Sequence, residues 1–338
     1  MASFNLLDLP YVARQHVFKQ MGFLELFDMS LCSKQMKNFV KSSSKKWNCK
    51  MSICVDEHFS ISIYDLDDEV LAKFESLSRV MYNVNEMLIP EEDESIINYR
   101  DIDMFHLPSI VYTGDLPVLR TFWMDSLMGG KVLLKHLIDI FSFEMDHLTV
   151  WIDELYEDFQ SIIRWINRIP CDLKTFNGKE IDFLKYIWML ENVDSTSEVK
   201  FGVSVNGYSK VEELEMNFHE KMTINNAQWI DPNHLFSMNC FDLKIQDSML
   251  TEEEINGFLK TLKEGSNPNL HEMLIEFDEN HKLGLLEEIM DGLDSEEHSN
   301  GLYNFELENG NVCSVKFFIQ SNQNGQLNDA IRMSIDRD

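Results

Sequence analysis

The sequence has few basic residues for its length. Only 29 Lys and Arg stand against 58 Asp and Glu in 338 residues, which gives a formal net charge of −29. A body this acidic repels phosphate backbones, so we do not expect a nucleic-acid-binding protein. Long apolar runs are also missing, because the longest, around residues 183–190, is interrupted by Lys185 and is too short to span a bilayer. We therefore expect no membrane partner.

Signals for secretion are absent as well. Asp8 and Pro10 interrupt the only early apolar stretch, and no Asn-x-Ser/Thr sequon occurs. The six cysteines are scattered through a chain that is too long to need disulfides for stability. We expect a cytoplasmic or nuclear protein with reduced thiols. The pair Cys49 and Cys54 has no second Cys or His pair nearby, so we predict no metal site.

Motifs of catalysis are lacking too. The sequence contains no phosphate-binding glycine loop, no His-Glu-x-x-His and no Gly-x-Ser-x-Gly. With 58 carboxylates some pair always resembles an acid–base couple, which is a consequence of composition. We predict no enzyme and no cofactor; a hydrolase with an unrecognised site is the remaining enzymatic alternative. The acidic run Glu91-Glu92-Asp93-Glu94 lacks the spacing of a calcium loop and is expected to be an exposed loop.

The first fifty residues differ from the rest, because they hold more Lys and Arg than Asp and Glu. Pro10 suits the first turn of a helix that ends at Gly22, a second helix follows, and a third is expected from Leu31. Three short helices cannot bury all their apolar side chains alone. This surface either packs on the rest of the chain or belongs to another protein.

These residues resemble the F-box family, and in particular its large nematode expansion. The spacing of its motif falls without a gap on Leu9-Pro10, Val17, Met21, Leu26 and Leu31-Cys32-Ser33-Lys34. Two positions depart from the pattern: Tyr11-Val12 replaces the usual acidic residue, and Met36 replaces the usual late Trp. The resemblance implies an F-box at about residues 4–45.

An F-box implies binding to the Skp-type adaptor of a cullin–RING ubiquitin ligase. The apolar contacts would come from packing of helices. The basic third helix, which includes Lys34, would either suit an acidic adaptor or form a solvated face. The residues expected to bind the adaptor are Leu9, Pro10, Val17, Phe18, Met21, Leu26, Leu31, Cys32 and Lys34.

The rest of the chain predicts an α/β body. Alternation at Phe59, Ile61 and Ile63 indicates a strand in a connecting α/β region, residues 46–145. Residues 146–338 show strand-like pieces at fairly regular intervals, with helical patterns between most of them, which favours a leucine-rich-repeat-like solenoid over an irregular α/β layer fold. The strand starts are expected near Leu148, Leu173, Phe201, Leu214, Leu243 and Met273.

Capping and turn residues refine this prediction. Asp231-Pro232 and the capping box Thr251–Glu254 predict two helix starts. Asn206-Gly207 between alternating runs favours a hairpin, and Asn309-Gly310 predicts a second one followed by a last strand through Ile331, Met333 and Ile335. Residues 294–300 are expected to be a loop.

A second resemblance covers about residues 211–277. It is similar to the type 2 F-box-associated domain of nematode proteins, on Asn225-Asn226-Ala227-Gln228-Trp229, Leu235, Asn239-Cys240, Leu250-Thr251, Asn256-Gly257-Phe258-Leu259, Gly265 and Asn267-Pro268-Asn269-Leu270. Trp229 is expected to anchor the core and not to contact a ligand.

Together the two resemblances imply a substrate-recognition subunit of an SCF-type E3 ubiquitin ligase. The F-box would dock the adaptor, and the body would hold an unknown target protein, with no covalent role for this chain. The alternative is an interaction or structural protein outside any ligase, whose N-terminal helices pack on its own body.

Overall fold

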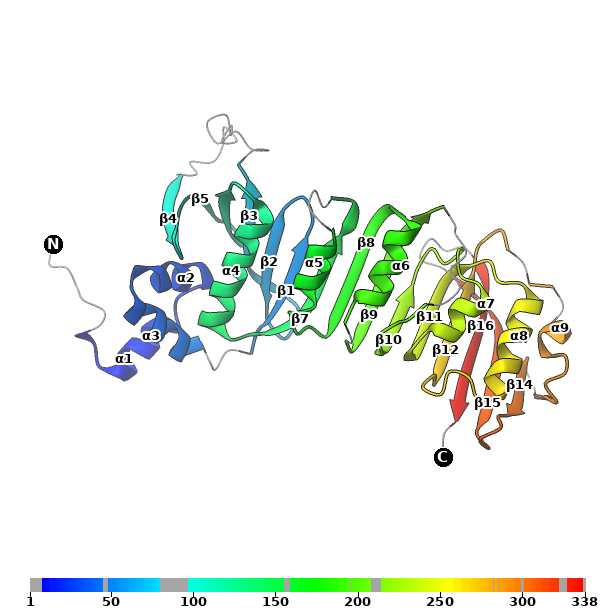
Figure 1. The fold of residues 1–338 in the computed structure, drawn as a ribbon. Helices are drawn as coiled ribbons and strands as arrows, with labels where there is room; N and C mark the ends of the chain where they lie inside the picture. Colours follow the sequence, from blue (N-terminus) through cyan, green and yellow to red (C-terminus); the bar gives the residue numbers. More distant parts are fainter. Residues whose placement is uncertain are drawn as a thin grey trace. The chain divides into compact units, whose positions relative to one another are not determined.

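A computed structural model describes residues 8–44, 48–79, 97–154, 159–194, 196–207, 214–281, 283–284, 286–298, 301–321 and 327–336. The acidic run at 91–94 and the expected F-box residues 4–7 lie outside these ranges. The chain divides into two compact units, Met1–Val150 and Trp151–Asp338 (Figure 1).

The N-terminal unit begins with three helices, α1 (Tyr11–Phe18), α2 (Phe23–Cys32) and α3 (Lys34–Ser44). The break between α2 and α3 falls at Ser33, whose backbone is extended and whose hydroxyl oxygen accepts a hydrogen bond from Met36 N at 3.1 Å. The expected start of the third helix at Leu31 is therefore corrected to Lys34, because Leu31 and Cys32 complete α2.

A mixed sheet and one long helix complete this unit. The strands are β1 (Lys50–Val55), β2 (Phe59–Tyr64), β3 (Val70–Ser78), β4 (Asn98–Ile102), β5 (Phe105–Thr113), β6 (Pro117–Trp123) and β7 (Glu144–Trp151), in the order β7-β1-β2-β3-β6-β5-β4. Pairing is antiparallel except between β1 and β7 and between β3 and β6. The alternation of Phe59, Ile61 and Ile63 predicts β2 correctly, since these side chains are buried.

Helix α4 (Ser126–Phe141) packs against β2, β3 and β6. Asp125 caps its start by accepting from Leu127 N and Met128 N, and Ser142 ends it in the left-handed conformation. The helix can approach the sheet closely because Gly129 and Gly130 face it. A Cβ at Gly130 would come within 1.9 Å of the Phe59 ring.

The C-terminal unit alternates strands and helices. Its elements are the 3-10 turn η2 (Ile152–Glu154), α5 (Phe159–Ile166), β8 (Leu173–Asp182), α6 (Phe183–Asn192), β9 (Glu198–Asn206), β10 (His219–Ile224), α7 (Pro232–Ser237), β11 (Cys240–Ser248), α8 (Glu252–Lys263), β12 (Glu272–Phe277), α9 (Leu286–Met290), β13 (Glu296–His298), β14 (Leu302–Glu306), β15 (Val312–Ser321) and β16 (Leu327–Asp336). The order within the sheet is β8-β9-β10-β11-β12-β16-β15-β14-β13.

Strands β8 to β12 are parallel and follow the order of the chain, with α6, α7 and α8 on one face (Figure 1). The last four strands are antiparallel. The mixed α/β class with an N-terminal helical region and a large sheet body is therefore correct. A leucine-rich-repeat-like solenoid is not confirmed, because the unit ends in four antiparallel strands, β13 to β16.

Two local predictions need correction. Asn206-Gly207 does not form a hairpin between neighbouring antiparallel strands, because β9 and β10 are parallel. Residues 214–218 are not a strand, and the pairing segment is His219–Ile224. Within the expected loop 294–300, Glu296–His298 pairs with β14. The second hairpin, β14–β15, and the last strand, β16, are present as expected.

Candidate functional site

The three N-terminal helices have a shared core. Phe18, Leu26, Met36 and Val40 are buried, and the Arg14 guanidinium lies 4.3 Å from the centroid of the Phe39 ring, which ties α1 to α3. Phe18 and Leu26 are each only 1% exposed. These two residues hold the helices together and do not lie on an outward face.

One face of α2 is covered by the rest of the N-terminal unit. The Phe23 ring makes edge contacts with Phe141 and Phe143, and the Phe27 ring packs 5.1 Å from Phe74 and 5.3 Å from His136. Such aromatic pairs add about 0.5–1.5 kcal/mol each beyond the area that they bury. The helix is therefore docked on α4 and on the sheet.

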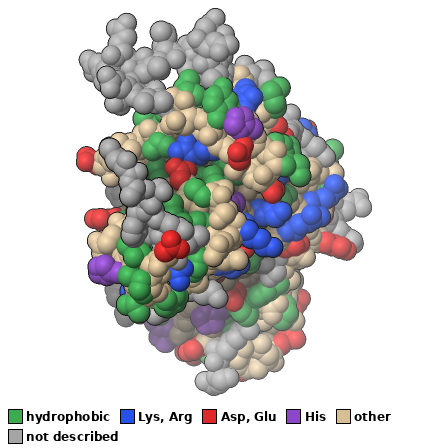
Figure 2. All heavy atoms as spheres, turned by 90° about the vertical axis from the view of Figure 1, so that its left-hand side faces the viewer, with side chains coloured by type: hydrophobic (Ala, Val, Ile, Leu, Met, Phe, Trp, Pro, Cys, Tyr) green, Lys and Arg blue, Asp and Glu red, His purple; other side chains and the backbone are tan. Residues whose placement is uncertain are grey.

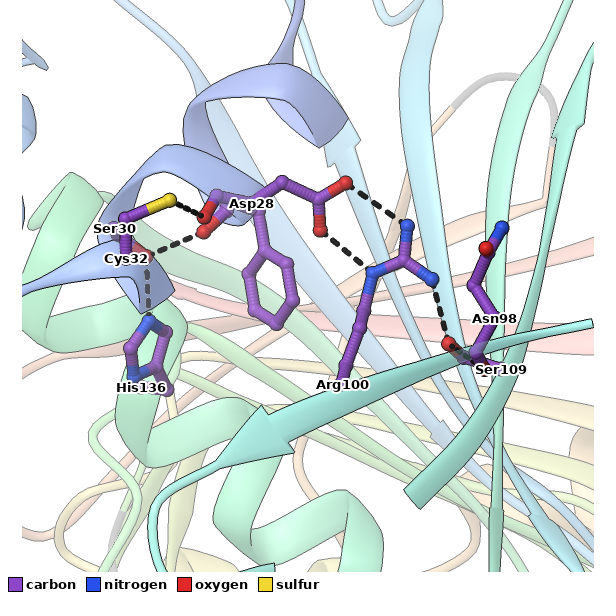
Figure 3. Close-up of polar contacts among 8 residues, drawn as sticks. Asp28, Ser30, Cys32, Asn98, Arg100, Ser109 and His136 are labelled. Carbon is purple, nitrogen blue, oxygen red and sulfur yellow. Dashed lines mark hydrogen bonds and ion pairs between the residues drawn. The ribbon is translucent and has the colours of Figure 1, made fainter. Parts of the chain in front are cut away.

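Polar contacts fix this docking (Figure 3). Arg100 on β4 donates from Nε and Nη2 to both carboxylate oxygens of Asp28, at 2.6 and 2.9 Å, and from Nη1 to the Ser109 hydroxyl. The Ser30 hydroxyl donates to the Phe27 carbonyl oxygen and forms a 2.7 Å hydrogen bond with His136 Nε2. A planar guanidinium paired in this two-pronged way fixes orientation as well as distance.

His136 and Asp139 on α4 titrate abnormally. Burial, and then the charge of Lys37, lower the pKa of His136 to about 4, so that the imidazole is neutral at pH 7. Hydrogen bonds from Lys37 and Lys41 lower the pKa of the Asp139 carboxyl to about 2. The Lys Nζ atoms lie 2.7 and 2.6 Å from its oxygens.

A neighbouring side of α2 forms a groove with α1, and Asp28 lines it at the edge of the docked face. The groove has a volume of about 570 Å³ and is lined by His16, Val17, Gln20, Met21, Glu25, Asp28, Met29 and Cys32. The groove residues of α2 lie three, four and seven positions after Glu25, so they share one side of the helix. Figure 2 shows apolar side chains among polar ones at this end of the molecule. The groove offers a partly apolar surface with polar rims, the arrangement that another protein's helix can fill.

The structure brings only some of the expected residues together. Val17, Met21 and Cys32 line the groove, and Leu9, Pro10, Leu31 and Lys34 are half-buried or exposed outside it. The pattern of apolar residues missed His16, Gln20, Glu25, Asp28 and Met29, because most of them are polar. Their helical spacing could have predicted the groove residues of α2, because one helix face carries Glu25, Asp28, Met29 and Cys32.

Other kinds of site find little support. Within the described ranges no three His, Cys, Asp or Glu side chains gather as metal ligands. Among the same residues, no helix is long and apolar enough to cross a membrane.

Comparison with known proteins agrees with these observations. Residues 6–48 match the family of the F-box domain, and residues 211–275 match the F-box associated family. A Caenorhabditis elegans protein named Skn-1 dependent zygotic transcript 15 protein is 28% identical over 285 residues, which cover 81% of this chain and 79% of that protein.

A second C. elegans protein, the uncharacterized protein F59B2.9, is 36% identical over 80 residues, or 24% of this chain and 17% of that protein. No solved structure matches the chain. The resemblances predicted from the motifs are confirmed: the chain carries a match to the F-box domain and a match to the F-box associated family, and it is similar to a C. elegans protein over most of its length.

Proposed function

We propose that this protein is the substrate-recognition subunit of an SCF-type cullin–RING ubiquitin ligase. The observation that carries the proposal is the open groove between α1 and α2 within the F-box, on a helix whose other face is already docked. F-box domains typically bind a Skp-type adaptor, and this groove is the partly apolar surface that such a partner would cover.

Within this proposal the expected contact residues have two roles. Val17, Met21 and Met29 supply apolar surface in the groove, and full burial of each such side chain is worth about 1.5–3 kcal/mol before the costs of association. Leu9, Pro10, Leu31, Cys32 and Lys34 extend the contact around it. Phe18 and Leu26 act indirectly, by holding α1 and α2 at the separation that forms the groove.

The body would hold the target. We propose three parts, namely an F-box at 4–45, a connecting region at 46–145 and an F-box-associated region at 146–338. Strands β8–β12 would act as a repeat-like surface whose helix-free face binds the target protein. The chain would raise the local concentration of a target lysine near the charged E2 enzyme, in the cytoplasm or nucleus, and would perform no chemistry itself.

One observation favours the alternative of a module outside any ligase. Helices α2 and α3 do pack on their own body, through Phe27, Arg100 and Asp139 among others. That packing uses only one face of α2. The alternative therefore needs the groove on the other face to have no partner.

Binding of the full chain to a purified Skp-type adaptor tests the proposal. Both Val17→Asp and Met21→Asp place a charge in the groove, at positions that are only half-buried in the free protein. We expect the double variant to bind at least about a hundredfold more weakly, since placing two carboxylates against an apolar partner costs more than about 2.7 kcal/mol.

The control is Leu184→Asp on α6, a position that is 65% exposed in the C-terminal unit. It should bind as the wild type does. The proposal fails if wild-type protein shows no binding at micromolar concentration, or if the groove variant binds as tightly as the control.

A further inference from the structure

Lysines gather on α3 and α4 beside the F-box groove. Lys34, Lys37 and Lys41 are three and four residues apart on α3, and Lys131 and Lys135 are four apart on α4. Residues at these intervals share one side of a helix. Figure 2, which faces the left-hand side of Figure 1, shows a band of Lys and Arg side chains.

The two rows of lysines belong to one surface. Helix α3 packs against α4, and Lys37 and Lys41 both reach the Asp139 carboxylate on α4, at 2.7 and 2.6 Å. Lys135 lies one turn before Asp139, and Lys131 one turn before Lys135. We call these five lysines, Lys34, Lys37, Lys41, Lys131 and Lys135, the cationic ridge.

Lys34 and Lys135 leave part of the charge of the cationic ridge unneutralised. One carboxylate, Asp139, is shared by Lys37 and Lys41. In the described part of the chain no carboxylate lies within ion-pairing distance of Lys34 or Lys135, and both side chains are exposed. These five lysines gather in a chain whose net charge is −29.

The cationic ridge is continuous with the groove. Cys32 lines the groove, and Lys34 follows two residues later, after the turn between α2 and α3. The Ser30–His136 hydrogen bond joins the end of α2 to α4 at the same place. A partner seated in the groove would therefore meet the ridge at its edge.

We propose that the cationic ridge binds an acidic segment of the same adaptor that occupies the groove, so that adaptor docking continues past the F-box onto helix α4 of the body. This inference rests on the proposed function. An acidic protein segment fits better than a nucleic acid, because a chain with a net charge of −29 repels phosphate backbones. Complementary charge of this kind chiefly raises the rate of association.

Association kinetics of the full chain with a Skp-type adaptor test the inference, measured at about 0.05 M and about 0.5 M salt. The variant is Lys131→Glu/Lys135→Glu, because both lysines lie outside the residues that match the F-box. We expect kon at low salt to fall by roughly tenfold or more and the difference to shrink at high salt, with koff changed much less. Lys135→Glu alone, at a fully exposed position, repeats the test if the double variant folds poorly.

The matched control is Lys179→Glu/Lys185→Glu, which makes the same change in net charge at exposed positions of the C-terminal unit. The ridge inference is wrong if the ridge variant associates with the adaptor as fast as this control does. The proposed function still stands in that case, provided that wild type binds the adaptor and Val17→Asp/Met21→Asp does not. If wild type does not bind at all, both fail. A short duplex DNA bound at 0.15 M salt by wild type but not by the ridge variant would also overturn the inference.

Discussion

At the residue scale, Arg100 joins α2 to the sheet through hydrogen bonds from its guanidinium. Its side chain is 12% exposed, and it donates to both oxygens of Asp28 and to Ser109. Asp28 is 45% exposed and can be rehydrated when its partner is lost. The pair therefore lies between a surface ion pair, which contributes little, and a buried one, which is costly to break.

Replacing Arg100 should loosen α2 from the sheet. We expect Arg100→Ala to lower the free energy of unfolding by about 1–3 kcal/mol, measured by urea denaturation, because charge-assisted hydrogen bonds are lost. Arg100→Lys should recover only part of this, since an ammonium cannot bond both carboxylate oxygens in one plane. Arg168→Ala, at an exposed position, serves as the control. Equal stability of Arg100→Ala and this control would contradict the assigned role.

The buried imidazole of His219 should make stability depend on pH. Burial, and then the charge of Lys174, lower the pKa of His219 from 6.5 to about 4. The His219 imidazole is thus protonated near pH 6.5 in the unfolded chain, but only near pH 4 in the folded chain. The contribution of neutral His219 to the free energy of unfolding is therefore fully present above pH 6.5, and it is lost as the pH falls towards 4.

For wild type we expect the free energy of unfolding to fall by roughly 2–3 kcal/mol through His219 between pH 7.5 and 4.5, at about 1.4 kcal/mol per pKa unit. His219→Met keeps a side chain of similar size and removes the titration, so its loss of stability over this range should be smaller by that amount. Identical pH dependence of the two proteins, measured by denaturation at several pH values, would argue against this account.

At the element scale, α4 connects the sheet with the F-box helices. Its buried face packs on β2, β3 and β6, and its outer face meets α2 and α3. Both contacts depend on how closely the helix approaches the sheet, which Gly129 and Gly130 permit. A Cβ at Gly129 would lie 2.3 Å from the Trp123 ring.

Gly130→Ala should therefore destabilise the N-terminal unit in spite of the higher helix propensity of alanine. The added Cβ would overlap the Phe59 ring, which is 1% exposed and has no space to move, so we expect a loss of about 1–3 kcal/mol in thermal or urea unfolding. Gly257→Ala on α8 is the matched control, because nothing lies within 4 Å of its Cβ position. It should stabilise by about 0.5–1 kcal/mol, and the same sign for both substitutions would contradict the packing argument.

Elements set by local chemistry could be predicted from sequence. Asp231 and Thr251 cap α7 and α8 as expected, since a capping bond joins residues only two or three apart. The hairpin at Asn206-Gly207 was wrong because alternation does not tell a parallel neighbour from an antiparallel one. The groove was found only in part, since its rim of Glu25 and Asp28 becomes recognisable once the neighbouring face of α2 is known to be buried.

At the scale of the whole molecule, one face of the F-box is docked on the rest of the N-terminal unit and another face is open. Phe27, Asp28 and Lys37 attach it to the sheet and helix of the N-terminal unit, and the α1–α2 groove remains open. Fixing the helices on the body in advance lowers the ordering cost that the adaptor would otherwise have to offset. In the proposed function, the C-terminal unit with its parallel strands β8–β12 would bind the target.

Hydrogen exchange of the full chain, with and without a saturating Skp-type adaptor, tests this account most directly. Slowed exchange in Tyr11–Phe18 and Phe23–Cys32 is the result that the account predicts, with β9 to β12 unchanged. Unchanged exchange in α1 and α2 on a protein that is demonstrably bound, or protection confined to the C-terminal unit, would contradict it.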